Sequence, residues 1–307
     1  MTDEGVAIAH LSRNKTGYQL EHVDYAPANG LPEINSKLAH WVKEFQVKDS
    51  QTNFVLSLSD ANILLTEAPE VEDKELSKAM RWKLKDNPDV NLEKSIVDVF
   101  PIPGQRERGR QPMAYVVSAE KKLLKNYVSL IEKNDLQLTS IDITAMALRN
   151  IASQFPEDEQ GVAFLSLNAR RGLLSLSRKG DLYLTRDLEV GYQSFASEEV
   201  SQQGDMQIEG LPPATQQTLE QIVLEVQRSM DYYERYFAQP PIQNLVLAPL
   251  PSVIPGLSDE IAHQLGMKVR ELDISEIVDV QTSEFERGLQ SQCLPAIGAA
   301  LRMTMVA

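Results

Sequence analysis

The turn at Asn168–Gly172 has the residue types most able to bind a charged ligand. The stretch GVAFLSLNARRGLLSLS, residues 161–177, predicts two strands joined by this turn. Arg170 and Arg171 could attract an anion by charge, and the backbone N–H groups of a tight turn can face phosphate oxygens. The same residues are also typical of a solvent-facing turn that binds nothing. We predict the solvent-facing turn.

Other residue types that commonly do chemistry are few and scattered. The chain has no glycine-rich Walker loop, no Gly-x-Ser-x-Gly elbow and no cysteines or histidines at metal-ligand spacing. Cys293 is predicted to be a small buried residue, because no base lies near it in sequence. The histidines are predicted to be surface or hydrogen-bonded structural residues: His10, His22, His40 and His263. The sequence therefore predicts no catalytic residue and no metal site.

Composition is that of a folded, soluble protein. The chain has 307 residues, of which 42% are hydrophobic and 24% charged, and it is long enough for two domains. Its formal net charge of -14 argues against nucleic-acid binding and against a polybasic membrane anchor, because both depend on lysine and arginine. No secretory signal or membrane-spanning stretch is evident, and a single cysteine fits a reducing compartment. We expect a cytoplasmic protein with no membrane-inserted segment.

Hydrophobic periodicity predicts two successive α/β halves of similar plan. Each half opens with antiparallel strand patterns, at residues 6–23 and 162–188, and continues with alternating helices and strands. The strongest helix pattern places these apolar residues on one stripe: Leu219, Ile222, Val223, Val226, Met230, Tyr233 and Phe237. The polar, proline-interrupted segment 153–161 predicts a boundary between domains 1–155 and 156–307.

Several segments together resemble the PilM-type proteins of type IV pilus assembly, including the MshI-type protein of mannose-sensitive (MSHA) pilus systems. More distantly they resemble the cytoplasmic domain of the GspL-type secretion protein. The stretches that carry the resemblance span roughly residues 5–302 in the family's order: YVVSAEKKLLKNYVSLIEKNDLQLTSIDITAMAL, RKGDLYLTRDLEVG, LEQIVLEVQRSMDYY, NLVLAPLPSVIPGLSDEIAHQLGMKV and AIGAALR. The resemblance implies the actin-like ATPase fold, with duplicated ribonuclease H-like halves. It also implies an inserted subdomain at about 70–141 and a C-terminal helix, 293–304, that packs back on the first half.

The resemblance also locates the turns that would hold a nucleotide. Nucleotide-binding members use Asp-x-Gly and Gly-Gly turns, because glycine lets the backbone approach the ligand and the aspartate helps to hold magnesium. Here the second Asp-x-Gly falls on Ser166-Leu167-Asn168, and the Gly-Gly turn falls on Pro249-Leu250. Asp3-Glu4-Gly5 lies near the first phosphate turn, and the strand that should precede it is either lacking or lies outside the given sequence. The resemblance therefore implies a degenerate cleft at Ser166, Asn168, Arg170, Arg171, Pro249 and Leu250, with ATP and magnesium disfavoured.

By this resemblance we expect a non-catalytic cytoplasmic scaffold at the inner face of the bacterial inner membrane. PilM-type proteins clasp the cytoplasmic tail of a PilN-like single-span membrane protein between the first subdomain and the inserted one. Candidate groove residues are Leu56, Leu58 and Ile63, on the two strands before the insertion, and Trp82 in its first helix. Ordinary core packing is the competing interpretation for all of them.

Three alternatives stay open at this stage. The chain could be a working ATPase or nucleotide switch that uses Asn168, Arg170 and Arg171, or a GspL-like component of type II secretion. A sugar kinase on the same fold would need an aspartate base beside a sugar pocket, and no motif supplies one. The sequence leaves the oligomeric state open.

Overall fold

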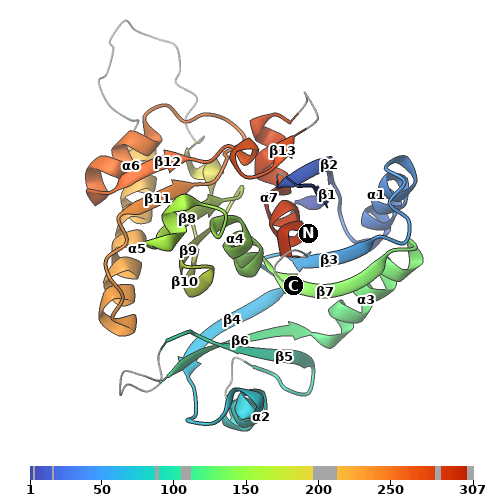
Figure 1. The fold of residues 1–307 in the computed structure, drawn as a ribbon, viewed down its shortest axis with the longest axis horizontal. Coiled ribbons are helices and arrows are strands. Elements are labelled where there is room, and N and C mark those ends of the chain that lie inside the picture. Colours follow the sequence, from blue (N-terminus) through green and yellow to red (C-terminus); the bar gives the residue numbers. More distant parts are fainter. Residues whose placement is uncertain are drawn as a thin grey trace, which may run out of the picture. The chain divides into compact units, whose positions relative to one another are not determined.

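The computed structural model describes residues 1–2, 4–15, 17–86, 90–104, 112–195, 213–280 and 285–302 (Figure 1). The chain divides into two compact units. Unit 1 comprises Met1–Leu11, His22–Ala147 and Pro295–Ala307, and unit 2 comprises Ser12–Glu21 and Leu148–Leu294. Each unit therefore combines segments that are far apart in the sequence.

Unit 2 is built on a five-stranded sheet with the order β10-β9-β8-β11-β12. Its strands are β8 (Val162–Leu167), β9 (Gly172–Arg178), β10 (Asp181–Leu188), β11 (Asn244–Leu247) and β12 (Lys268–Glu271). The first three form antiparallel hairpins, and β11 runs parallel to both β8 and β12. Because β8 lies at the centre, its sequence is an almost continuous apolar run.

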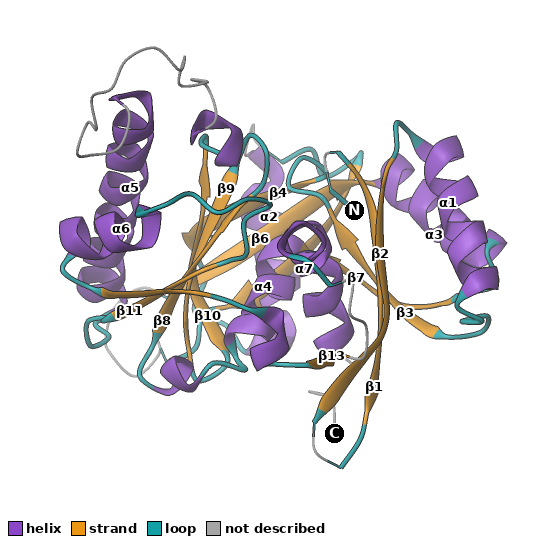
Figure 2. Cartoon of the chain, turned by 90° about the horizontal axis from the view of Figure 1, so that it is seen from above, coloured by secondary structure: helices purple, strands orange, loops and turns teal. Residues whose placement is uncertain are grey.

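Two α-helices that lie wholly in unit 2, α5 (Pro213–Phe237) and α6 (Leu257–Leu265), flank this sheet (Figure 2). Short helical turns η3 (Pro156–Glu159), η4 (Tyr192–Phe195) and η5 (Ile274–Glu276) lie in its loops. The predicted apolar stripe of α5 is buried along its whole length. Tyr233 and Phe237 meet the ring of Tyr183 on β10 at centroid distances of 5.5 and 5.9 Å, which fixes α5 against the sheet.

Unit 1 contains two pairs of strands and their covering helices. One pair is the hairpin of β1 (Gly5–Arg13) and β2 (Tyr18–Pro27). Its tip, Ser12–Glu21, is counted with unit 2, where Gln19 and Leu20 of β2 pair with the short β13 (Asp279–Val280). Separately, β3 (Gln51–Leu56) runs parallel to β7 (Gln137–Ile143). The helices α1 (Leu31–Glu44) and α3 (Lys121–Lys133) bury apolar residues at helical spacing: Ile34, Leu38 and Trp41, and Tyr127, Leu130 and Ile131.

A third sheet of unit 1 forms the inserted piece. It has the order β4-β6-β5, and β6 (Met113–Glu120) pairs antiparallel with both β4 (Ala61–Glu67) and β5 (Ser95–Pro101). The helix α2 (Asp73–Lys83) and the turn η1 (Leu84–Asp86) lie between β4 and β5 in the sequence. Its core contains Leu76, Met80, Leu84, Ala114 and Val116. Residues 61–120 thus form a separate sheet between β3 and β7 in the sequence, because β4 pairs with β6 and β7 pairs with β3. The inserted subdomain at about 70–141 stays a prediction.

The last part of the chain packs inside unit 1. The helices α4 (Thr144–Ala152) and α7 (Arg287–Leu301) approach so closely that a Cβ added to Gly298 would lie 2.2 Å from the carbonyl oxygen of Ala147. Asn53 Nδ2 donates to the Ala299 carbonyl at 3.0 Å, and Arg302 pairs with Asp142 at 2.7 Å. These contacts attach residues 295–302 to β3 and β7, more than 150 residues earlier in the chain.

Candidate functional site

The residues implied as nucleotide-cleft positions in unit 2 meet at one edge of its sheet. Ser166 and Asn168 lie at the end of β8, and Pro249 and Leu250 follow β11. β8 and β11 are parallel neighbours, with Leu165 opposite Leu247, and the Ala248 amide donates to the Leu165 carbonyl at 2.8 Å. The carboxyl ends of parallel strands are where ligands bind in sheets of this kind. The two turns that the resemblance located in the sequence therefore lie at the same edge of the sheet.

The β8–β9 turn uses its own side chain to satisfy its backbone. Asn168 Oδ1 accepts from the Arg171 amide at 2.7 Å and from the Arg170 amide at 3.3 Å. The Asn168 amide in turn donates to the Arg171 carbonyl at 2.9 Å. A phosphate in such a turn would need those two N–H groups, because they are the donors that point into it. Asn168 Oδ1 therefore already accepts the two hydrogen bonds that a bound anion would need.

A neighbouring segment covers the same turn. The Tyr192 amide donates to the Asn168 carbonyl at 2.9 Å, and the Gln193 amide donates to the Ala169 carbonyl at 3.0 Å. Gly191 lies so close that an added Cβ would be 2.4 Å from the Ala169 carbonyl carbon. Asn168 Oδ1 therefore engages the Arg170 and Arg171 amides, and residues 192–193 engage the Asn168 and Ala169 carbonyls.

The two arginines of the turn differ in their surroundings. Arg171 donates to Asp187 Oδ2 at 2.9 Å, so its charge is paired across the β9–β10 hairpin. Burial raises the pKa of the Asp187 carboxyl above its usual value, and the charge of Arg171 opposes that rise. Arg170 is exposed.

The second turn, Pro249-Leu250, is closed by packing. Leu250 is only 5% exposed, and Pro249 is buried. Proline has no amide hydrogen, and the leucine side chain fills the space that two glycines would leave for a ligand. The remaining ligand turn, Asp3-Glu4-Gly5, includes Asp3, which lies outside the described residues.

The candidate partner-binding residues of unit 1 have very different environments. Leu56 ends β3 and is 3% exposed, so its side chain belongs to the core. The expectation that Leu58 lies on a strand is wrong, because it lies half-buried in the turn between β3 and β4. Ile63 is half-buried on β4, opposite Val117 of β6. Trp82 on α2 is 78% exposed, with the Lys85 ammonium 5.6 Å from its ring centroid.

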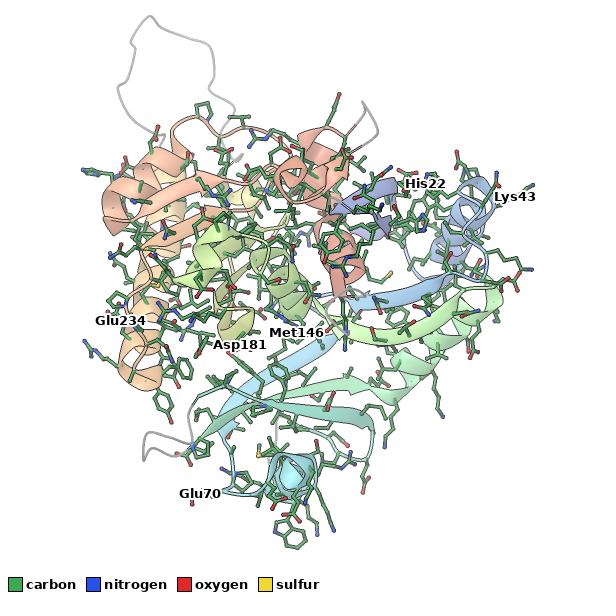
Figure 3. The ribbon with its side chains drawn as sticks, viewed as in Figure 1. His22, Lys43, Glu70, Met146, Asp181 and Glu234 are labelled. Atoms are coloured by element: carbon green, nitrogen blue, oxygen red, sulfur yellow. The ribbon has the colours of Figure 1, made fainter. Side chains whose placement is uncertain are left out.

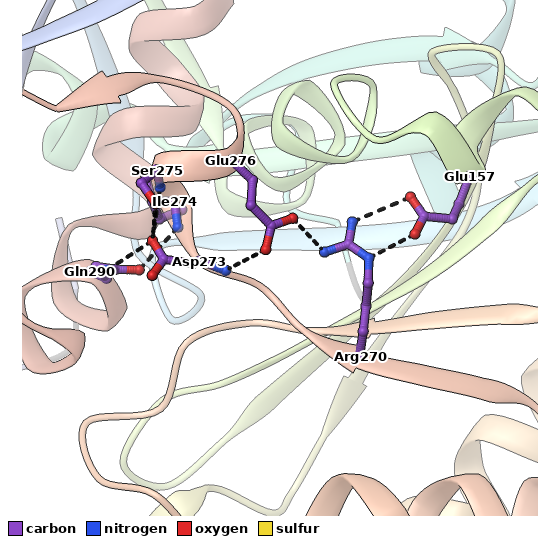
Figure 4. Close-up of polar contacts among 7 residues, drawn as sticks. All are labelled: Glu157, Arg270, Asp273, Ile274, Ser275, Glu276 and Gln290. Atoms are coloured by element: carbon purple, nitrogen blue, oxygen red, sulfur yellow. Dashed lines mark hydrogen bonds and ion pairs between the residues drawn. The ribbon is translucent and has the colours of Figure 1, made fainter.

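A polar network in unit 2 was not anticipated from the sequence (Figure 4). Arg270 on β12 donates to Glu157 Oε1 at 2.7 Å and Oε2 at 3.2 Å, and to Glu276 Oε2 at 2.9 Å. The hydrogen bonds from Arg270 hold the pKa of Glu157 below its usual value. Asp273 and Glu276 form a capping box on η5, which the pattern D-x-x-E could have revealed. The network joins η3, β12 and η5, and its role is structural.

The histidines do not form a metal site. His22, which Figure 3 labels, lies on β2. Its ring stacks on His10 of β1 and on Phe45, with centroid distances of 5.8 and 4.6 Å. His40 contacts Glu44 at 3.0 Å, and His263 is exposed. Among the described residues no group of histidine, cysteine and carboxylate side chains is placed to hold a metal ion. Cys293 is fully buried, which confirms the prediction for that residue.

Within the described ranges, no helix combines the length and the apolar character that crossing a membrane requires.

The strand order of unit 2 and the α/β plan of the whole chain define the actin-like ATPase fold, as predicted. The family model described as "Type IV pilus assembly protein PilM" matches residues 2–304, and the chain therefore belongs to that family. The chain is similar to the solved "PilM-PilN type IV pilus biogenesis complex", with a TM-score of 0.75 and 20% identity, over 98% of this chain and 96% of that chain. No curated protein sequence matches this chain.

A second similar structure comes from a secretion system. It is the cytoplasmic domain of EpsL, an inner-membrane component of the type II secretion system of Vibrio cholerae. The TM-score is 0.51 at 12% identity, over 96% of this chain and 92% of that chain. At these identities both structures show the shared fold. The predicted resemblance to PilM-type proteins is confirmed by the family match.

Proposed function

We propose that this protein is a non-catalytic scaffold of type IV pilus assembly, of the mannose-sensitive class. It works in the cytoplasm at the inner membrane, where it docks the cytoplasmic tail of a PilN-like membrane protein. Membership of the PilM family supports the role in pilus assembly. The partner is suggested by the similar structure, which is a complex of PilM with PilN.

The self-satisfied turn at Asn168 is the observation that carries the non-catalytic part of this proposal. Its amides are bonded to Asn168 Oδ1, and the facing turn is closed by Leu250. Binding a triphosphate there would require breaking these hydrogen bonds, and none of residues 168–171 is a glycine that would ease the rearrangement. The net charge of -14 adds a general repulsion of polyanions.

The nucleotide part of the proposal is tested by calorimetric titration with Mg-ATP and by thermal shift at about 1 mM nucleotide. We expect no heat of binding and no change in melting temperature. Binding tighter than about 100 μM would stabilise the protein by roughly 1.4 kcal/mol or more at that concentration, which a melting curve detects. Such a shift would replace the scaffold proposal with a nucleotide switch.

The inserted sheet offers the surface that best fits a docked tail. β4 and β5 are its edge strands, so each has one edge with no strand beside it among the described residues. An extended peptide can add to such an edge and place alternate side chains in apolar positions. Ile63 on β4 is half-buried, and Trp82 on α2 presents a large exposed ring.

The docking surface is tested with a synthetic peptide of the cytoplasmic N-terminal tail of the PilN-like protein from the same organism. Trp82→Ala and Ile63→Asp are expected to weaken its binding at least about tenfold, because a buried aromatic anchor contributes 2 kcal/mol or more at an interface. Val253→Ala is the matched control, since Val253 is 57% exposed but lies in unit 2. Equal binding by all variants would place the tail elsewhere.

A nucleotide switch is the second candidate function, and one observation favours it. Arg170 is an exposed cation at the ligand-binding edge of the unit 2 sheet. An Arg170→Ala variant separates the two functions, because it would abolish a nucleotide-dependent thermal shift but leave tail binding unchanged. The similarity to the EpsL cytoplasmic domain makes a role in type II secretion the remaining alternative. A strain that lacks the gene separates the two roles, because loss of pili indicates pilus assembly and loss of secretion indicates type II secretion.

A further inference from the structure

The outer face of α2 carries positive charge and an exposed tryptophan. The helix packs on the β4-β6-β5 sheet through Leu76, Met80 and the adjoining Leu84, which are 0–3% exposed (Figure 1). Because a helix turns by about 100° per residue, Lys78 and Trp82 lie on the side opposite this buried row. The exposed side chains of residues 77–85 include no acid: Ser77, Lys78, Arg81, Trp82, Lys83 and Lys85.

The central charges of this face are not neutralised within the described part of the chain. Ion pairs there involve two lysines, at 2.6 and 3.9 Å: Lys74 with Glu72 and Lys83 with Glu67. Among the described residues, no carboxylate pairs with Lys78, Arg81 or Lys85. Arg81 lies three residues after Lys78 and four before Lys85, and like charges at these spacings repel one another on a helix. An anionic surface outside the protein would relieve this repulsion.

Trp82 lies in the middle of these cations. At 78% it is the most exposed of the large hydrophobic side chains in the described part of the chain. The Lys85 ammonium lies 5.6 Å from its ring centroid, so the cation and the ring belong to one patch. Tryptophan combines an apolar ring with an N–H donor and is enriched at the depth of lipid headgroups. A helix with an aromatic residue among lysines and arginines is typical of proteins that bind the surface of anionic membranes.

The net charge of -14 argued against a polybasic membrane anchor, but that number averages over the whole chain. Salt screens charges beyond about 8 Å at physiological ionic strength, so the charges nearest to a membrane decide whether it attracts the protein. The face is also the outer side of a helix and is therefore convex. A plane of headgroups can contact a convex ridge, whereas small ligands and peptides need a concave site. These features favour a lipid surface over an acidic peptide.

We propose that the outer face of α2 binds the surface of an anionic phospholipid membrane. Lys78, Arg81 and Lys85 lie near the lipid phosphates, and the Trp82 ring lies among the headgroups. The contact is peripheral and goes beyond the proposed function, because it needs no protein partner. Each cation near such a surface strengthens binding by roughly fivefold, so the contact is weak by itself. It adds to the affinity of a tail that is anchored in the same membrane, because the two contacts then act together.

Tryptophan fluorescence and vesicle flotation test this contact with the full chain. The protein is mixed with vesicles of phosphatidylethanolamine and phosphatidylglycerol, or with neutral phosphatidylcholine vesicles, in the absence of any tail peptide. Trp41 is 2% exposed and its indole N–H donates to Asp24 at 2.7 Å, so a change in emission on binding reports on Trp82. We expect the anionic vesicles alone to float the protein and to shift its emission to shorter wavelength. Raising NaCl from about 0.1 M to about 0.5 M should release it.

Two double variants locate the contact. Lys78→Glu with Lys85→Glu should lower the partition coefficient onto anionic vesicles at least about twentyfold, since two cations near the surface are lost. Lys37→Glu with Lys43→Glu is the matched control, because both lysines are exposed on α1 and the net charge changes by the same amount. The control should stay within about twofold of the parent protein. All four lysines are exposed, so both variants should melt within about 2 °C of the parent protein.

Three results would overturn the proposal: no binding to anionic vesicles, equal binding to neutral vesicles, or an equal loss of binding in the two double variants. Soluble polyglutamate is the probe for the competing occupant. An emission shift with polyglutamate but none with vesicles would assign the face to an acidic protein segment and overturn the membrane contact. Binding of the tail is measured without lipid and binding of vesicles without the tail, so the failure of one does not imply the failure of the other.

Discussion

At the residue scale, the ion pair between Glu157 and Arg270 makes stability depend on pH. Because Arg270 lowers the pKa of Glu157 below its usual value of 4.5, the pair stabilises the fold above that pH. This stabilisation is lost as the pH falls through the lowered pKa of the folded state. We expect Glu157→Gln to lower the free energy of unfolding by about 1–2 kcal/mol at pH 7, with a difference that narrows below about pH 4.

Urea denaturation at several pH values measures this difference. Glu159→Gln is the matched control, because Glu159 is 72% exposed and pairs with Lys179 at the surface. It should change stability by less than about 0.5 kcal/mol. A Glu157→Gln effect of the same size at pH 3 and pH 7 would contradict the ionic explanation.

Two tyrosines have raised pKa values, and removing the hydroxyl group of each should change the free energy of unfolding by a different amount. Tyr127 donates to Asp60 at 2.9 Å, whereas the Tyr233 hydroxyl is buried without a hydrogen-bond partner in the described part of the chain. Burial is the main cause that raises the pKa of Tyr233 to about 12. We expect Tyr127→Phe to cost about 1 kcal/mol and Tyr233→Phe to be neutral or stabilising. Equal losses in chemical denaturation would show that Tyr233 has a partner.

At the element scale, the contact between α4 and α7 depends on Gly298. An added methyl group would lie 2.2 Å from a backbone oxygen of Ala147, and neither backbone can move without shifting its helix. Gly298→Ala should therefore lower the free energy of unfolding by about 2–3 kcal/mol. Gly288→Ala in the same helix is the control, because nothing lies within 4 Å of its added Cβ. Alanine there should be neutral or stabilise slightly, since it favours helix over glycine.

At the scale of the whole molecule, the C-terminal segment is part of unit 1. Residues Ile297, Ala299 and Leu301 are 0–2% exposed, and Asn53 and Asp142 bond to this segment. Deleting residues 295–307 exposes apolar surface of unit 1 and removes those bonds. We expect the shortened protein to melt at least about 10 °C lower or to aggregate on expression, as measured by thermal denaturation and size exclusion. Unchanged melting would mean that unit 1 folds without α7.

Patterns that act over a few residues were predictable from the sequence. The buried stripe of α5 and the hairpins of residues 162–188 follow from local spacing. The turns at Asn168 and Pro249 were located by the family resemblance, and the residue types there predicted that they lack the glycines of a ligand turn. The family resemblance added the fold, because it ordered segments that periodicity alone could not place.

Pairing between distant segments was decided only by the tertiary structure. β4 joins β6 and not β3, Asn53 bonds to the Ala299 carbonyl, and Arg270 reaches Glu157 across 113 positions. Strand patterns record which face is buried, but they do not record which edge meets which, because backbone hydrogen bonds are the same for every residue type except proline.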